Sequence, residues 1–90
     1  MIRTIEKFGA EWCGPCKVLE TNLRGISGVD IVKFDADQDP ELFEVQGIKT
    51  VPVMVFKDEH GNIVETVTGL RTKAEIQKII DKYAELSGNG

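Results

Sequence analysis

Cys13 and Cys16 are the only cysteines in the chain, and they lie two residues apart in the stretch EWCGPCK. A pair at this spacing could supply half of a metal site, form a structural disulfide, or act as a dithiol that opens and closes during a reaction. Structural zinc needs four ligands, and the one histidine, His60, lies in a turn-like segment. A structural disulfide across so short a loop gains little entropy, and the cytosol keeps such bonds reduced. The sequence therefore favours redox chemistry over these two alternatives.

A predicted helix gives the redox interpretation a mechanism. Cys16, Leu19 and Leu23 recur at helical spacing, and Pro15 suits the first turn of a helix. Cys13 would lie just before this helix, where unpaired N–H groups and the helix dipole stabilise a thiolate. Cys16 would be the more buried sulfur. The outer thiolate could attack a substrate disulfide, and the inner thiol could then resolve the mixed disulfide.

The elements that would position this pair follow one another in the order β-α-β-α-β-β-α. Apolar alternation, buried runs and caps predict strands at 1–8, 29–35, 51–57 and 63–68, and helices at 14–24, 40–46 and 73–86. Asp39 can cap the second helix, and Thr72 and Glu75 form a capping box before the third. The first two strands should be parallel and the last two a hairpin. We therefore expect one α/β domain over residues 1–86, with a four-stranded mixed sheet, helices on both faces and a frayed tail at 87–90.

Composition limits the classes of function. The length of 90 residues fits one domain, and no apolar run approaches the roughly 18 residues that a membrane span needs. A net charge of −4 disfavours nucleic-acid binding, which needs a basic surface. The N-terminal stretch MIRTIEKF lacks the apolar core of a secretory signal. We expect a cytoplasmic monomer that binds neither nucleic acid nor membrane and holds neither metal nor cofactor.

The sequence around the cysteines resembles the active-site signature of the thioredoxin family. Besides AEWCGPCK, the segments VKFDADQDPELFEVQGIKTVPVMVFK and GNIVETVTGL resemble later parts of that family, in the same order. The resemblance runs from Ile2 to Tyr83. It implies a thioredoxin-like fold and the reduction of protein disulfides, with disulfide-containing proteins as substrates and a thioredoxin-reductase-type electron donor.

The resemblance also implies roles for individual residues. Cys13 would be the nucleophile and Cys16 the resolving thiol. The other positions that it implies at the site are Trp12, Gly14 and Pro15 around the thiols, Val51 and a cis Pro52 facing an extended substrate, Gly69 on the docking surface, and Lys33 near the thiols.

The sequence departs from the family pattern at its start. It begins at the strand that leads into the active site, so we expect the family's first strand and helix to be missing, as in the minimal topology of glutaredoxins. Leu70 and Arg71 follow Gly69, where glutaredoxins have a glycine pair that helps to hold glutathione. Because the expected topology is shared with glutaredoxins, a glutathione-dependent reductase is the alternative within redox chemistry. A partner subunit with idle thiols is the alternative outside it.

Lys7 stands where thioredoxins have a buried aspartate. A protonated lysine cannot take the proton of Cys16 at neutral pH. One hypothesis places its ammonium in water or beside Glu6 or Glu11, with the stem on apolar surface. The other places the ammonium close enough to the sulfurs to favour their thiolates. We favour the first, which predicts that Lys7→Met changes the exchange rate by less than about threefold.

Overall fold

The computed structural model describes residues 1–88, and it describes burial for residues 1–84. The elements follow the predicted order: β1 (Ile2–Gly9), α1 (Gly14–Arg24), β2 (Asp30–Asp35), α2 (Pro40–Val45), β3 (Val53–Asp58), β4 (Ile63–Thr68) and α3 (Lys73–Gly88). Within the described residues, no helix has the length and apolar character needed to cross a membrane.

The four strands form one mixed sheet in the order β2-β1-β3-β4. β1 runs parallel to β2, and β3 runs antiparallel to both β1 and β4. The α/β class, the four-stranded mixed sheet and the order of elements predicted from the sequence are confirmed. β1 is a central strand that ends at Gly9, and the segment that follows it carries the two cysteines.

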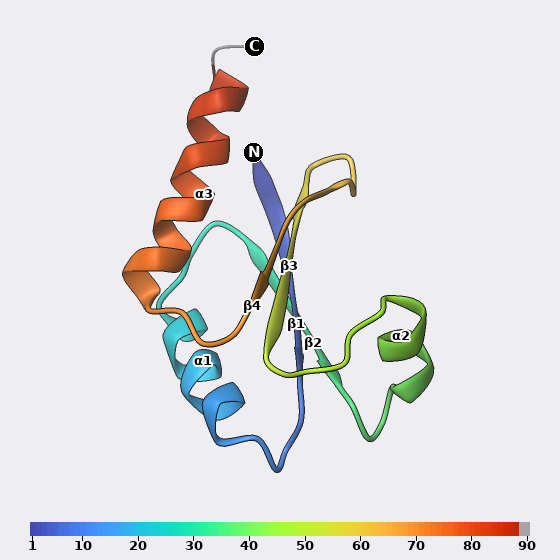
Figure 1. Cartoon of the computed structure of the whole chain (residues 1–90). Helices are drawn as coiled ribbons and strands as arrows, with labels where there is room; N and C mark the ends of the chain where they lie inside the picture. Colours follow the sequence, from blue (N-terminus) through green and yellow to red (C-terminus); the bar gives the residue numbers. More distant parts are fainter. Residues whose placement is uncertain (89–90) are drawn as a thin grey trace.

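Helices cover both faces of the sheet, with α1 and α3 on one side and α2 on the other (Figure 1). The larger core lies under α1 and α3 and consists of Ile2, Ile5, Leu19, Leu23, Ile26, Met54, Phe56, Val67 and Ile76. The smaller core lies under α2 and consists of Phe8, Phe43, Val53 and Val55.

Alternation along β1 decides which of its side chains face α1. Successive side chains of a strand point to opposite faces of the sheet. Ile5 belongs to the core under α1 and Phe8 to the core under α2. Lys7 and Gly9 therefore share the face of Ile5 and lie under α1.

The residues at the starts of α1 and α3 act as predicted from the sequence, whereas the predicted cap of α2 does not form. Pro15 occupies the first turn of α1. Before α3, the N–H of Thr72 donates to the Glu75 carboxylate at 2.9 Å and the N–H of Glu75 donates to the Thr72 hydroxyl at 3.1 Å, which is the predicted capping box. Asp39 precedes α2 as predicted, but its side chain does not cap the helix. That carboxylate instead accepts the N–H of Asp35 at 3.2 Å.

The predicted tail lies partly inside α3, which continues through Gly88. Residues 87 and 88 are helical, and the fraying of the tail stays a prediction. The remaining tail residues, 89 and 90, lie outside the described residues. The domain limits of 1–86 stay a prediction.

Candidate active site

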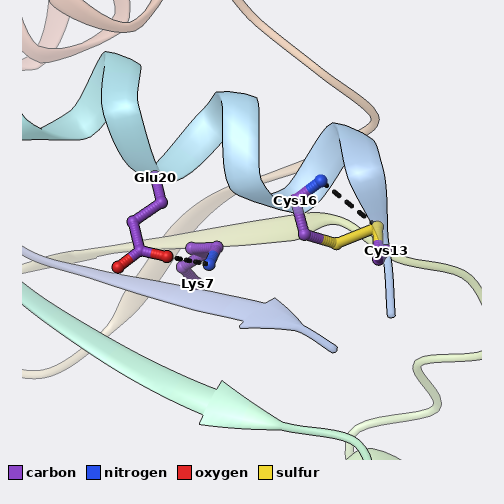
Figure 2. The surroundings of a disulfide bond; sticks show 4 residues. All are labelled: Lys7, Cys13, Cys16 and Glu20. Atoms are coloured by element: carbon purple, nitrogen blue, oxygen red, sulfur yellow. Dashed lines mark hydrogen bonds and ion pairs between the residues drawn. A yellow bond between two sulfur atoms is a disulfide. The ribbon is translucent and has the colours of Figure 1, made fainter. Parts of the chain in front are cut away.

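The two cysteines form a disulfide at the start of α1, with their Cα atoms 5.3 Å apart. Cys13 is the N-cap residue, and the N–H of Cys16 donates to its Sγ at 3.2 Å (Figure 2). The start of the helix therefore directs an N–H group and the positive end of its dipole at the Cys13 sulfur, where they stabilise negative charge. Cys16 is 1% exposed and Cys13 6%, so Cys16 is the more buried cysteine.

Gly9 allows α1 to approach the end of β1 closely. A Cβ on Gly9 would lie 3.3 Å from the Cys16 Sγ and 3.3 Å from its Cβ. The Gly9 carbonyl accepts the N–H of Ala36 at 2.9 Å, and the N–H of Cys13 donates to the Ala10 carbonyl at 3.1 Å. The first bond joins the ends of β1 and β2, and the second closes the turn that carries the cysteines.

The segment before β3 packs against the disulfide. Val51 contacts the small apolar cluster of Ala10, Cys13 and Cys16. The Val51-Pro52 peptide bond is cis, as the resemblance implied. Gly69 has φ +99°, a value that favours glycine, and its N–H donates to the Pro52 carbonyl at 2.9 Å. The structure therefore places Val51 against the cysteines and Gly69 against Pro52, the residue that follows Val51.

An apolar groove of about 610 Å³ lies next to the disulfide. Its lining residues come from the segment before α1, from α2 and from the segment before β3, and include Trp12, Ala36, Pro40, Phe43, Ile48 and Val51. Trp12 is 68% exposed and is available to contact another molecule. Pro52 is buried and, like Gly69, is outside the set of residues that line the groove. Gly14 and Pro15 are exposed at the start of α1.

A second, polar cleft of about 720 Å³ opens on the other side of Cys16. Lys7 lies in its wall, only 7% exposed, and its Nζ forms an ion pair with Glu20 of α1 at 3.7 Å. Figure 2 shows Lys7 beneath α1, between Glu20 and the cysteine pair. The hypothesis that we favoured from the sequence is wrong about the partner of Lys7, because Glu6 pairs with Lys57 at 3.1 Å and Glu11 is exposed.

Glu20 joins two lysines from neighbouring strands. Lys7 and Lys33 are partners in the parallel register of β1 and β2, and the Lys33 Nζ donates to Glu20 at 2.6 Å. Burial lowers the pKa of Lys7, and the charge of Glu20 opposes that shift. The hydrogen bond from Lys33, together with the charge of Lys7, holds the pKa of Glu20 below its usual value. The structure thus brings both predicted lysines to the site through an acidic residue.

Sequence reasoning missed Glu20 and most of the groove. Glu20 lies four residues after Cys16 on α1, so both occupy the same face of the helix. That spacing could have identified it. Phe43 and Ile48 reach the groove only because α2 folds back over the sheet, and no local pattern in the sequence shows this.

A disulfide that spans three residues does little to hold a fold together, because it closes a very short loop. Here it lies at a helix start beside an apolar groove, where one sulfur can carry charge and the other is shielded. A thiol–disulfide oxidoreductase has this arrangement.

Comparison with known proteins defines the family. The family model for thioredoxin matches residues 3–82. The chain is 37% identical over 81 residues to a thioredoxin of Listeria monocytogenes, covering 84% of this chain and 78% of the relative. It is 40% identical over 81 residues to a thioredoxin of Chlamydia muridarum, with the same coverage of 84% and 78%.

A solved structure gives the same result. A point mutant of thioredoxin from Halobacterium salinarum superposes with a TM-score of 0.80 at 31% identity, covering 89% of this chain and 73% of that one. The chain belongs to the thioredoxin family, and Cys13–Cys16 is its redox disulfide.

Proposed function

We propose that this protein reduces disulfides in other proteins by dithiol–disulfide exchange at Cys13-Gly14-Pro15-Cys16. The observation that carries the proposal is the bond from the N–H of Cys16 to the Cys13 Sγ at the start of α1. This contact and the helix dipole stabilise a thiolate on Cys13 once the disulfide is reduced. Cys13 is therefore the attacking sulfur and Cys16 the resolving one.

The reaction needs only the two thiols of this chain and the substrate disulfide. The Cys13 thiolate attacks one substrate sulfur, forms a mixed disulfide and releases the other substrate sulfur as a thiolate. The Cys16 thiolate then attacks the Cys13 Sγ, which forms the Cys13–Cys16 bond and releases the second substrate sulfur. The substrate gains two electrons and the protein loses two, so the protein must be reduced again before the next cycle.

The apolar groove beside the disulfide suits an extended polypeptide. Trp12, Phe43 and Val51 line it, and Val51 also packs against the cysteine cluster. A segment bound there would place its disulfide beside Cys13. We propose disulfide-containing proteins as substrates, a thioredoxin-reductase-type donor, and the cytoplasm as the place where such a donor keeps the pair reduced. One copy of the chain supplies every group of the site, so a monomer suffices.

Insulin reduction by dithiothreitol tests the activity. We expect the wild-type protein to accelerate it and the variants Cys13→Ser and Cys16→Ser to lose the effect. Cys16→Ser should also accumulate mixed disulfides with substrate proteins, whereas Cys13→Ser should not, because only Cys13 attacks the substrate. No acceleration by the folded wild-type protein would support a partner subunit with idle thiols. Trapping by Cys13→Ser instead would reverse the two roles.

A further inference from the structure

Lys7 places a buried positive charge close to the resolving sulfur. Among residues 1–84 it is the one charged side chain that is buried. A Cβ added to Gly9 would lie 3.3 Å from the Cys16 Sγ and 3.4 Å from the Lys7 Cε. The Cys16 Sγ and the Lys7 Cε are therefore no further apart than the sum of these two distances. The ammonium nitrogen of Lys7 is bonded directly to Cε. The geometry favours the second hypothesis for Lys7, in which the ammonium acts on the sulfurs.

Glu20 holds this charge in place and is a poor base. Its carboxylate pairs with Lys7 at 3.7 Å and accepts a hydrogen bond from Lys33 at 2.6 Å. The pKa of Glu20 is lowered, first by the hydrogen bond from Lys33 and also by the charge of Lys7. A carboxylate held ionised in this way keeps Lys7 charged but takes up a proton only at low pH.

The other charged groups around the cleft act on Cys16 more weakly. Glu11 and Lys17 are exposed, and Lys33 is 57% exposed, so water and salt screen their charges. The Asp35 carboxylate already accepts the N–H groups of Asp37 and Gln38, and the Asp39 carboxylate accepts the N–H of Asp35. Charges interact most strongly where water is excluded. Lys7 therefore contributes most to the potential at the Cys16 sulfur.

We propose that Lys7, held by Glu20, is a positioning residue that stabilises the thiolate of Cys16 in the mixed disulfide. The proton of the Cys16 thiol leaves to water in the polar cleft, and Lys7 stays protonated throughout. The Cys16 thiolate then forms the bond to Cys13 as the Cys13–substrate bond breaks, and the departing substrate thiolate takes a proton from water. The role of Cys16 as the resolving thiol rests on the proposed function.

A titration of Cys16 alone tests this role. In the Cys13→Ser background the chain has one thiol, and ultraviolet absorbance of its thiolate can be followed against pH without a reagent having to reach the buried sulfur. We expect Lys7→Met to lower the thiolate fraction about tenfold at neutral pH and to move the midpoint upward.

Lys17→Met is the matched control, since Lys17 lines the same cleft but is exposed. We expect it to change the thiolate fraction by less than about threefold. An unchanged midpoint in Lys7→Met, or an equal shift in Lys17→Met, would overturn the proposal. The titration measures the effect of Lys7 on the ionisation of Cys16 even if the protein fails to reduce insulin. A failure of the proposed function is therefore distinguishable from a failure of this inference.

Discussion

Replacing Lys7 by methionine should make the fold more stable, because the position is costly for a charge. The Lys7 side chain is 8% exposed and lies in the wall of the polar cleft, so its ammonium is partly desolvated. Desolvation of an ion costs several kcal/mol even after the protein relaxes. The attraction between Lys7 and Glu20 at 3.7 Å stabilises the charge by about 4.5 kcal/mol at an effective dielectric constant of about 20. Desolvation is the larger of the two, since the pKa of Lys7 is lowered by burial in spite of the charge of Glu20, so the charge has a net cost to the fold.

Methionine removes the cost and keeps the apolar stem. Glu20 keeps its hydrogen bond to Lys33 and is 32% exposed, so the substitution does not leave a buried carboxylate unpaired. We expect Lys7→Met to raise the free energy of unfolding of the oxidised protein by about 1–2 kcal/mol at neutral pH. The melting temperature should rise by about 5 °C or more. Urea unfolding followed by circular dichroism gives both the free energy and a check on cooperativity.

The gain should shrink at high pH. Burial lowers the pKa of Lys7 in the folded protein below its ordinary value of 10.5. At a pH between the pKa of Lys7 in the folded protein and its ordinary pKa, the unfolded chain binds more protons than the folded one. The stability of the wild-type protein therefore rises with pH in this range, relative to that of Lys7→Met. At a pH below the pKa of Lys7 in the folded protein, the lysine is charged and the full cost of burying that charge is present. The difference between the two proteins should therefore be largest near neutral pH.

Lys57→Met is the control for this experiment. It removes the cation that faces Glu6 at 3.1 Å, and Glu6 is only 15% exposed, so this variant should be destabilised. If Lys7→Met is destabilised by more than about 1 kcal/mol, beyond the range of an ordinary surface ion pair, the argument that its burial is costly is refuted.

Two further predictions concern partners. Trp12→Ala should raise KM for insulin with little change in stability, because Trp12 is 68% exposed and lines the groove. Val45→Ala, at an apolar residue 82% exposed and outside the residues that line the groove, should leave KM unchanged; equal effects would argue against docking in the groove. A thioredoxin reductase should reduce the protein faster than glutathione does, in coupled assays with each donor. Turnover with glutathione alone would instead favour the glutathione-dependent alternative.

Local patterns were sufficient to predict the sheet and its helices. Pro15, the Thr72–Glu75 capping box and the alternation of β4 are signals within a few residues, and each marks an element where it was expected. The cysteine pair was equally local, because a spacing of two residues across a helix start brings the sulfurs together. Asp39 was the exception. Its carboxylate turned to the N–H of Asp35 because the chain folds back there before α2.

The groups around Cys16 depend on packing between elements, and this limited the prediction. Glu6 was expected beside Lys7 as its neighbour in sequence, but adjacent residues of a strand point to opposite faces, so the two cannot meet within β1. The partner comes from α1, and the register between α1 and β1 selects Glu20. Pro52 was expected to face an extended substrate; it is buried, and residues of α2 line the groove instead.

The position of Lys7 also bears on the direction in which electrons flow. The disulfide carries no charge, whereas the reduced pair can carry a thiolate, so a nearby cation stabilises the reduced form more than the oxidised one. Stabilising the reduced form raises the reduction potential of a dithiol pair. Glu20 limits this effect because it offsets the charge of Lys7, and Lys33 in turn offsets Glu20. The charges of Lys7, Glu20 and Lys33 together therefore set how readily Cys16 ionises. The burial of Lys7 that makes this possible lowers the stability of the fold.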